Sequence, residues 1–457
     1  MFDVCVLGGG PAGSTLALRL AQLGHSVAIV EKSPVPRSHI AESLAAGALP
    51  LLDVIGLRHC IENADFVFSS AATLRWANEL SRREHNAFQA DRGRFDAFLL
   101  NAAAHAGVTI RQLDQLKATR FDERNGWELQ LCSGELLRAR YFANAGGRSC
   151  RIEGGPRKRT GPPALAMFAY WGGLDIDGPE AFVEAGAAHW YWGTSLPGGP
   201  FLACVFLDPK KANASRYEAL IRESKLLGAR LTGRAVCGPV SICDATPFCC
   251  LHPINARSVQ VGDAALAIDP LSAQGTETAI GTAIHAAAAI HTMLNRPADA
   301  SLAIDFYTKR VSNSARFHAA AAAAFYRRNL TAASFSPEAG AFWRKRAGPE
   351  VEHRDESTRP PLLWDQRIGL SRGVSLVRIG AIAGDYVVEA DALELNGVVS
   401  AYVAGFSIVD LVRDLGDENL TAGEVVGRWS RKMPAASGCA LLQSLWQQGL
   451  FETIVLH

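Results

Sequence analysis

The sequence carries almost no net charge and lacks the long hydrophobic runs of a membrane-spanning protein. Its 457 residues include 46 Lys and Arg against 45 Asp and Glu, which leaves a formal charge of +1 with the histidines neutral. This balance argues against a nucleic-acid-binding protein, because such proteins use a broad basic surface. No run approaches the roughly 18 apolar residues of a transmembrane helix, so we expect no membrane span. The candidate partners that remain are a polar small molecule and a surface patch of another protein.

A metal-binding cysteine pattern is also missing. The ten cysteines include Cys243, Cys249 and Cys250, whose spacing fits neither a CxxC pair nor a zinc pattern of Cys and His. We therefore predict no metal site, and reduced thiols as in a cytoplasmic protein. The N-terminus has no basic segment before its apolar start, which favours a first β-strand over a signal peptide.

The chain is too long for one ordinary domain. At about 150 residues per domain, its length predicts roughly three domains. Hydrophobic residues make up 48% of the sequence and charged residues 20%, which is typical of a globular protein. A chain of this size buries about three quarters of its unfolded surface and needs no disulfide scaffold.

The N-terminal segment has the pattern of a dinucleotide-binding βαβ unit. An apolar run over residues 2–7 leads into the glycine-rich segment 8–13, and an apolar helical stretch and a second strand at residues 27–30 follow. Gly10 allows the backbone to approach a pyrophosphate, and the following helix directs its N-terminus at the phosphate charge. Glu31 lies 18 residues after Gly13, where a carboxylate accepts hydrogen bonds from ribose hydroxyls.

A second segment indicates that the dinucleotide is FAD and not NAD. A strand at residues 259–261 ends in Gly262-Asp263, and Asp269-Pro270 then leads through Gly275 into an Ala-rich helix. Here the sequence resembles the FAD-dependent aromatic hydroxylase and flavin halogenase superfamily, whose "GD…DP…G" motif closes the flavin site. The resemblance implies that Asp263 binds the ribityl chain. It also implies that backbone amides near Gly275 and a helix N-terminus lie near the flavin ring, where they suit negative charge.

Two shorter segments also resemble this superfamily. Residues 91–96 resemble its "R..(F/L)D..L" helix, in which the arginine, here Arg92, contacts the cofactor, and residues 144–149 resemble its "DATGR.S" strand end. The resemblance covers about residues 1–330 and implies that FAD is bound. The residues expected to bind it come from these motifs: Gly8, Gly10, Pro11, Ala12, Gly13, Glu31, Lys32, Ser43, Arg92, Gly262, Asp263, Pro270, Gln274, Gly275 and Thr276.

The fold that we expect is α/β, with a Rossmann-type FAD-binding domain interrupted by a substrate domain. The first part of the FAD domain is expected over residues 1–110, and the substrate domain, an antiparallel sheet, over 111–254. The second part of the FAD domain, with long helices, is expected over 255–345. Residues 362–457 resemble the small winged-helix-like α+β domain of some flavin halogenases, and the lack of a basic face favours a structural or partner-docking role over DNA binding.

The choice between hydroxylase and halogenase depends on a few positions. Residues 189–197 resemble the halogenase "WxWxIP" signature but depart from it after the second tryptophan. Halogenases also carry a lysine that engages hypohalous acid, whereas this sequence has no lysine between Lys32 and Lys117. An arginine such as Arg75 stays charged and cannot replace that amine. Ser272 stands where tryptophan halogenases have a glutamate, so oxygen transfer is favoured over halogenation.

Residues 41–52 resemble the "GESL…ALPLL" element of a halogenase-like branch. That branch includes the flavoprotein maturases of tryptophylquinone enzymes, as in quinohemoprotein amine dehydrogenase biogenesis. The resemblance implies a monooxygenase that uses C4a-hydroperoxyflavin to hydroxylate the indole of a tryptophan residue in a partner polypeptide. A dry aromatic pocket is then expected, with walls formed by Trp190, Tyr191 and Trp192. The expected acid, base or positioning residues are Glu42, Arg75 and Glu277.

The electron donor and the substrate stay open at this point. The sequence contains no second nucleotide-binding motif, so electrons come either from NAD(P)H bound without a motif or from a separate flavin reductase, with O2 as oxidant. The alternatives to peptide hydroxylation are a flavin halogenase, a small-molecule aromatic hydroxylase and a non-catalytic flavoprotein that binds a partner through its C-terminal domain. None of these alternatives calls for nucleic acid or a membrane.

Overall fold

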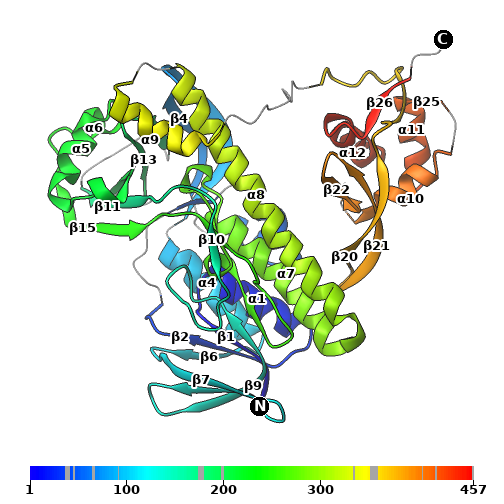
Figure 1. Cartoon of the computed structure of the whole chain (residues 1–457), viewed down its shortest axis with the longest axis horizontal. Helices are drawn as coiled ribbons and strands as arrows, with labels where there is room; N and C mark the ends of the chain where they lie inside the picture. The colour runs from blue at the N-terminus through cyan, green and yellow to red at the C-terminus, as the bar shows by residue number, and fades with distance from the viewer. Residues whose placement is uncertain are drawn as a thin grey trace. The chain divides into compact units, whose positions relative to one another are not determined.

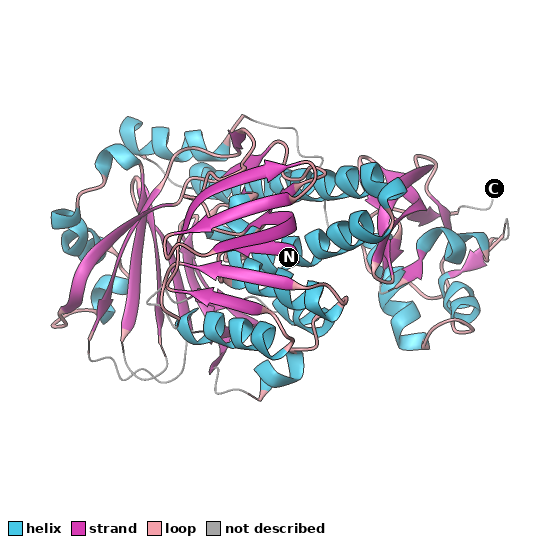
Figure 2. Cartoon of the chain, turned by 90° about the horizontal axis from the view of Figure 1, so that it is seen from below, coloured by secondary structure: helices cyan, strands magenta, loops and turns pink. Residues whose placement is uncertain are grey.

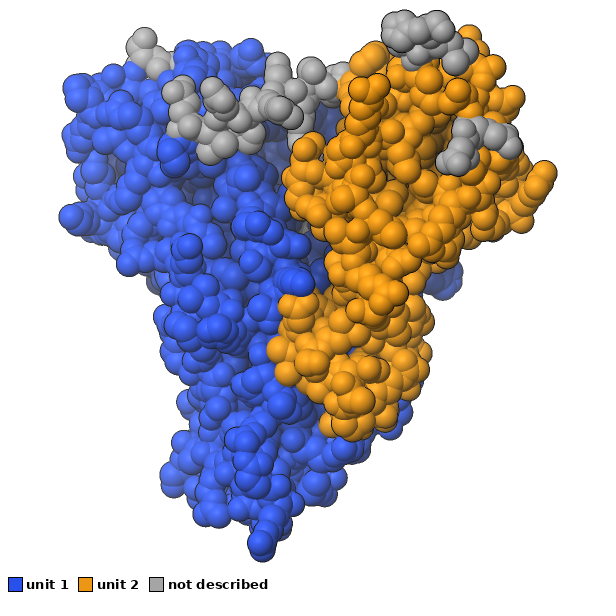
Figure 3. All heavy atoms as spheres, turned by 45° about the vertical axis from the view of Figure 1, so that its right-hand side comes forward, with its two compact units in different colours: residues 1–291, 307–349 blue, residues 292–306, 350–457 orange. Residues whose placement is uncertain are grey.

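The computed structural model describes most of the chain as two compact units (Figures 1 and 3). One unit comprises residues 1–291 and 307–349, and the other comprises residues 292–306 and 350–457. The described residues are 1–35, 42–44, 47–63, 67–90, 92–172, 180–196, 200–332, 335–349, 359–403, 405–416 and 419–454.

The first sheet of the larger unit has a parallel centre. Its strands lie in the order β6-β2-β1-β9-β8-β7, and β17 pairs with β9. Their bounds are β1 Phe2–Leu7, β2 Val27–Glu31, β6 Thr109–Gln112, β7 Leu116–Asp122, β8 Gly126–Leu131, β9 Leu136–Asn144 and β17 Ser258–Gln260. Each residue of β2 is buried, as expected for a parallel strand covered on both faces. Helices α1 (Pro11–Gln22) and α4 (Arg92–His105) pack beside each other next to this sheet.

A second sheet of eight strands is almost entirely antiparallel (Figure 2). We call it the large sheet; its order is β15-β11-β14-β13-β12-β4-β5-β3, and only β12 and β4 pair in parallel. The bounds are β3 Glu42–Leu44, β4 Val67–Trp76, β5 Glu79–Ala90, β11 Leu165–Trp171, β12 Glu180–Ala185, β13 His189–Ser195, β14 Phe201–Leu207 and β15 Val236–Asp244.

The two faces of the large sheet have separate cores. Helices α5 (Tyr217–Glu223) and α6 (Leu227–Arg230) pack on one face. On the other face lie α8 (Ala300–Ala332) and α9 (Pro337–Ala347). Residues of the second core include an aromatic set that we call the aromatic wall: Trp76, Trp190, Phe206, Tyr326, Phe342 and Trp343.

The remaining elements of the larger unit connect the two sheets. A three-stranded sheet joins β10 (Arg157–Arg159), β16 (Phe248–Cys250) and β18 (Leu266–Ala267). Helix α7 (Gly275–Asn295) begins in this unit and lies beside α8 (Figure 1). The shorter helices are α2 Ala48–Val54, α3 Arg58–Glu62, η1 Pro209–Lys211, η2 Ala214–Arg216, η3 Gly262–Ala264, η4 Pro270–Ser272 and η5 Pro297–Asp299.

The observed pairing of strands does not follow the domain boundary that was expected at residue 110. Strands β7, β8 and β9, expected in the substrate domain, belong to the first sheet because β9 pairs in parallel with β1. Strands β3, β4 and β5, expected in the FAD domain, belong to the large sheet. Both differences arise from pairing between strands far apart in the sequence, which local periodicity does not report. The domain division itself stays a prediction.

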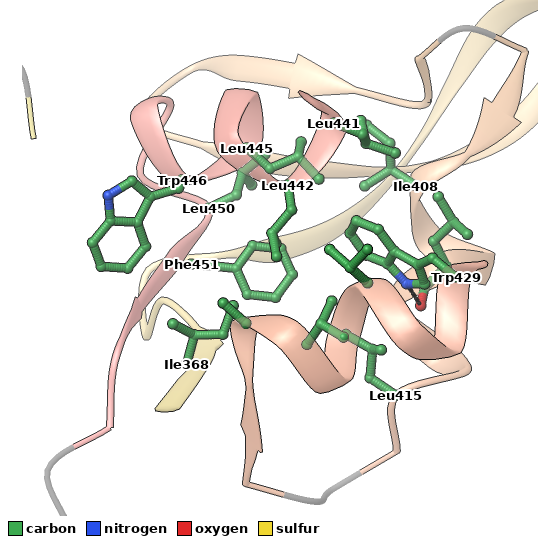
Figure 4. Packing of buried hydrophobic residues seen from close by; sticks show 14 of the residues in the cluster. Ile368, Ile408, Leu415, Trp429, Leu441, Leu442, Leu445, Trp446, Leu450 and Phe451 are labelled. Atoms are coloured by element: carbon green, nitrogen blue, oxygen red, sulfur yellow. Dashed lines mark hydrogen bonds between the residues drawn. The ribbon is translucent and has the colours of Figure 1, made fainter. Parts of the chain in front are cut away.

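The smaller unit has its own hydrophobic core (Figure 4). Leu442 and Leu445 of α12 (Ala435–Gln447) pack there with Phe451, and the indole N–H of Trp429 in α11 (Ala422–Trp429) donates to the carbonyl of Leu411 at 3.0 Å. The other elements are β19 Arg367–Leu370, β20 Ser375–Ala383, β21 Tyr386–Leu395, β22 Val398–Ser400, β23 Tyr402–Val403, β24 Phe406–Ser407, α10 Ile408–Arg413, β25 Leu420–Thr421 and β26 Phe451–Thr453. The winged-helix-like assignment stays a prediction.

Candidate functional site

The glycine-rich turn after β1 is packed too tightly for side chains. Gly8 has a φ of +102°, and a Cβ atom there would lie 2.5 Å from the carbonyl oxygen of Ala145. A Cβ atom on Gly13 would lie 1.9 Å from the carbonyl oxygen of Gly8. Gly10 is the N-cap of α1, and Pro11 follows in its first turn. The turn therefore brings backbone and a helix N-terminus close together at the carboxyl ends of β1 and β9, as a pyrophosphate requires.

Glu31 at the end of β2 points into this turn. Its side chain is 2% exposed, and its carboxylate accepts the backbone N–H of Gly9 at 2.6 Å and that of Ser33 at 2.8 Å. These two bonds fix the carboxylate beside the glycine turn, where the ribose of a dinucleotide is expected. Lys32 is exposed and faces away from the buried core.

The second predicted motif lies against the first. A Cβ atom on Gly262 would be 2.6 Å from the Cβ of Ala12, so η3 and the start of α1 are in direct contact. The N–H of Gly262 donates to Thr282 Oγ1 at 3.0 Å, and Asp263 forms an ion pair with Arg148 at 3.4 Å. Two segments about 250 residues apart in sequence thus form one site, which fits the expected FAD.

The chain from Asp269 to α7 forms a turn held by side-chain hydrogen bonds, which we call the motif turn (Asp269–Gly275). Asp269 accepts the N–H of Leu271 at 3.0 Å, and Pro270 begins η4. Ala273 has a φ of +53°. Helix α7 begins at Gly275, and a Cβ atom added to Gly275 would have no other atom within 4 Å. Gln274 is half-buried and Thr276 is buried. Helix α7 therefore begins at an uncrowded position, and a helix N-terminus suits a group with negative charge.

Glu277, in the first turn of α7, is a half-buried carboxyl group. Its Oε2 is buried and has no hydrogen-bond partner among the described residues, and burial raises the pKa of the side chain. A Cβ atom on Gly47 would lie 2.5 Å from Oε1, so the backbone before α2 closes over this carboxyl. Such a group holds its proton to a higher pH than an exposed glutamate does.

Three other predicted positions are placed only in part. Arg92 pairs with Asp96 one turn later in α4 at 2.9 Å, and both side chains are largely buried. Residue 91 lies outside the described residues. Glu42 and Ser43 lie in β3, whose backbone pairs with β5, but their side chains are outside the described part of the structure. The roles expected of Glu42 and Ser43 therefore stay predictions.

The three predicted pocket residues do not share one surface. Trp190 and Trp192 pack in the core that includes the aromatic wall, and Trp190 stacks on Phe206 with 3.9 Å between ring centroids. Tyr191 faces the other way, packs in the α5–α6 core and hydrogen-bonds His189 at 2.5 Å. Alternate residues of a strand point to opposite faces, so an unbroken aromatic run cannot line one pocket.

Arg75 lies on the same face as Tyr191 and away from the motif turn. It is paired with Glu184 in the register of β4 and β12, and its Nε lies 3.9 Å from Glu184 Oε1. Glu184 is 4% exposed and also accepts bonds from Ser224 and the backbone of Lys225 and Leu226. The pleat of β4 places Arg75 on one face of the large sheet, and Trp76 on the opposite face with the aromatic wall. The catalytic role expected of Arg75 stays a prediction.

Sequence reasoning missed the residues that cover the motif turn. Tyr326 of α8 donates its hydroxyl to Asp269 at 3.0 Å, and Arg346 and Trp343 of α9 lie in the same buried region. Each comes from a helix outside the recognised motifs. The sequence signal that could have pointed to them is the aromatic pair Phe325 and Tyr326, which follows a run of alanines.

The glycine turn, Glu31 and the Gly262-Asp263 segment together form a site that fits FAD. A family model described as an FAD binding domain matches residues 1–195. The chain is similar in sequence and in fold to FAD-dependent monooxygenases and halogenases.

Known relatives include both halogenases and a hydroxylase. A tryptophan 2-halogenase of Chondromyces crocatus is 28% identical over 338 residues, which cover 67% of this chain and 64% of that protein. The structure of QhpG, a peptidyl tryptophan dihydroxylase essential for tryptophylquinone cofactor biogenesis, matches with a TM-score of 0.74 at 24% identity over 98% of this chain and 99% of QhpG. That of CmlS, a flavin-dependent halogenase, matches with a TM-score of 0.81 at 20% identity over 100% of this chain and 98% of CmlS.

The likenesses to the two solved structures show the fold. The chain aligns with a little under two thirds of the length of the tryptophan 2-halogenase, and the two structures are below 25% identity. Within the described ranges, no helix meets the length and hydropathy of a membrane span, and no cluster of three His, Cys, Asp or Glu side chains could hold a metal ion.

Proposed function

We propose that this chain is an FAD-dependent monooxygenase that hydroxylates the indole ring of a tryptophan residue in a partner polypeptide. The observation that carries the proposal is the contact between the motif turn and the aromatic wall. Asp269 and Leu271 of this turn meet Tyr326, Trp190 and their neighbours in one buried region. An apolar, aromatic surface next to the flavin-facing turn suits an electron-rich aromatic substrate and excludes water.

The composition of the large sheet favours oxygen transfer over halogenation. None of its eight strands contains a lysine, although these strands carry the face that adjoins the motif turn. A halogenase of this superfamily is expected to present a lysine amine to its substrate, and the nearest cationic side chain in β4, Arg75, faces the other side of the sheet. The absence of lysine from these strands therefore supports hydroxylation.

The chain's own residues supply binding, orientation and proton transfer. When FAD is bound, it supplies the activation of O2 with two electrons from NAD(P)H or a flavin reductase. One oxygen atom of O2 replaces a ring hydrogen as a hydroxyl group, and the other leaves as water. The first N–H groups of α7 donate toward the flavin ring and stabilise negative charge there. Glu277, at the same helix end, holds or accepts the proton that the aromatic ring loses.

A polypeptide substrate is favoured over a free small molecule by the extent of the likeness to QhpG. That likeness runs over nearly the whole chain, including the C-terminal unit, and QhpG is a peptidyl tryptophan dihydroxylase. The C-terminal unit would then dock the partner. A halogenase remains the second candidate, because the 28% identity to a tryptophan 2-halogenase covers 67% of this chain.

The test is oxygen incorporation into a polypeptide. The FAD-loaded protein, supplied with NADPH or with a flavin reductase, is incubated under ¹⁸O2 with polypeptides that co-purify with it, and their tryptophan peptides are analysed by mass spectrometry. We expect one or more ¹⁸O atoms on a tryptophan, with or without added bromide or chloride, and none when O2 is removed. A halide-dependent mass gain would support the halogenase instead. Equal turnover of free tryptophan would point to a small-molecule hydroxylase.

A further inference from the structure

Asp269 of the motif turn is the meeting point of buried polar groups from three separate elements. The hydroxyl of Tyr326 lies 3.0 Å from Oδ1 and 3.2 Å from Oδ2 of Asp269. The same carboxylate accepts the N–H of Leu271 at 3.0 Å, which forms the first turn of η4. The turn that leads into α7 is therefore tied by a side chain to the middle of α8.

The hydroxyl of Tyr326 is buried together with its acceptor. Tyr326 is 2% exposed, and its hydroxyl donates to the carboxylate of Asp269. Trp190 of the aromatic wall packs in the same core, and the charge of Arg346 acts on both Asp269 and Tyr326.

Arg346 gives this group a buried positive charge. Its side chain is 5% exposed, lies 3.7 Å from the ring centroid of Phe342 and donates to the carbonyl of Pro163 at 3.3 Å. Its Nη1 has no hydrogen-bond partner among the described residues. Burial raises the pKa of Asp269, whereas the hydroxyl of Tyr326 and the charge of Arg346 favour its carboxylate. Asp269 is thereby held between the motif turn and the helices α8 and α9.

We propose that Tyr326 is a positioning residue that couples the aromatic wall to the motif turn and thereby tunes the bound flavin. The hydroxyl holds Asp269, Asp269 holds the turn Pro270–Ser272, and the turn fixes the direction of the first N–H groups of α7. We expect these N–H groups to face the ring of bound FAD, where a fixed turn would stabilise the anionic reduced flavin more than the neutral oxidised flavin. The proposal rests on the proposed function only for the binding of FAD.

The test is the midpoint potential of bound FAD in Tyr326→Phe, which removes the hydroxyl and keeps the ring. We expect the preference for reduced over oxidised flavin to fall about tenfold, which shifts a two-electron potential by about 30 mV to the negative side. The affinity for oxidised FAD should change by less than about threefold. Tyr307→Phe is the matched control, because Tyr307 is a buried tyrosine of the same helix whose hydroxyl donates to the carbonyl of Gln260 at 2.7 Å.

An unchanged potential in Tyr326→Phe, or an equal shift in Tyr307→Phe, would overturn the proposal. If Tyr326→Phe does not fold, Asp269→Asn serves as a second variant, because it replaces the carboxylate that accepts the Tyr326 hydroxyl with a neutral amide of the same shape. It should shift the potential in the same direction by a smaller amount, and no shift there would also overturn the proposal. The potential is measured without substrate, so a failure of tryptophan hydroxylation leaves this test intact.

Discussion

The carboxylate of Glu31 lies 2.6 Å from the backbone nitrogen of Gly9, inside the turn that connects β1 to α1. Its other oxygen accepts the N–H of Ser33 at 2.8 Å. One side chain thus connects the end of β2 with the glycine turn. The same carboxylate is placed to accept ribose hydroxyls, so we expect it to bind the cofactor as well as to hold the turn.

Removal of this carboxylate should weaken FAD binding strongly. A hydrogen bond to a charged group contributes about 1.5–3 kcal/mol, so Glu31→Ala should raise the dissociation constant of FAD at least about tenfold. A fluorescence titration of FAD measures the change. The control is Glu128→Ala, which removes a surface glutamate that pairs with Arg138 in the same sheet. Wild-type affinity in Glu31→Ala would contradict the assignment of this residue to the cofactor site.

Substitution of Arg75 tests whether this residue takes part in catalysis, as expected from the sequence, or only packs on the far face of the large sheet. Arg75 lies on the α5–α6 face and its Nε is 3.9 Å from Glu184, so Arg75→Ala should lower turnover by less than about twofold and stability by less than about 1 kcal/mol. Denaturant unfolding and a steady-state assay give the two values.

Glu184 provides the contrast for that experiment. Its buried carboxylate accepts the hydroxyl of Ser224 at 2.6 Å and the N–H of Leu226 at 2.8 Å, so Glu184→Ala leaves these donors without a partner. We expect a loss of about 2 kcal/mol or more of unfolding free energy. A large loss of turnover in Arg75→Ala, with stability unchanged, would support the catalytic role expected from the sequence.

The motifs predict the cofactor half of the site because its chemistry is local. The glycine turn and Glu31 come from one βαβ unit, whose sterics and hydrogen bonds follow from consecutive residues. The substrate half depends on which face of a strand is buried and on which distant helix covers it. Thus Trp190 and Tyr191, adjacent in sequence, belong to different cores, and Tyr326 carried no motif that pointed to Asp269. Both placements depend on packing between distant parts of the chain, which a single sequence does not reveal.

A histidine pair makes stability depend on pH. His25 Nε2 lies 2.8 Å from His291 Nδ1, with Asp3 and Arg140 nearby. Burial, followed by the charge of His291, lowers the pKa of His25 from 6.5. A depressed histidine pKa means that the unfolded chain takes up the proton first, so stability is present above pH 6.5 and is lost as the pH falls below it.

His25→Gln should therefore lose less stability between pH 7 and pH 5 than the wild type does. Glutamine retains a group that can hydrogen-bond His291, but it does not titrate. Thermal unfolding at several pH values measures the difference. His59→Gln, at an exposed position of α3, is the control and should follow the wild type. A steeper acid loss in His25→Gln would contradict the pairing.

Glu277 should show the opposite dependence on pH. Burial raises the pKa of this carboxyl above 4.5, so the folded chain keeps the proton after the unfolded chain has lost it. The contribution of Glu277 to stability is therefore fully present below pH 4.5 and is lost as the pH rises through the raised pKa. Glu277→Gln mimics the neutral carboxyl, so its melting temperature relative to wild type should increase from pH 4 to pH 8.

The same substitution tests proton transfer, because a glutamine cannot hold or release the proton. Turnover should fall about 100-fold, the lower end of the usual contribution of a general acid or base. FAD affinity should stay within about threefold, since the Glu277 carboxyl is held beside Gly47 and not in the glycine turn. The control is Glu218→Gln, at an exposed position of α5. A variant that gains stability at pH 8 yet keeps full turnover would leave Glu277 as a buried carboxyl without a catalytic role.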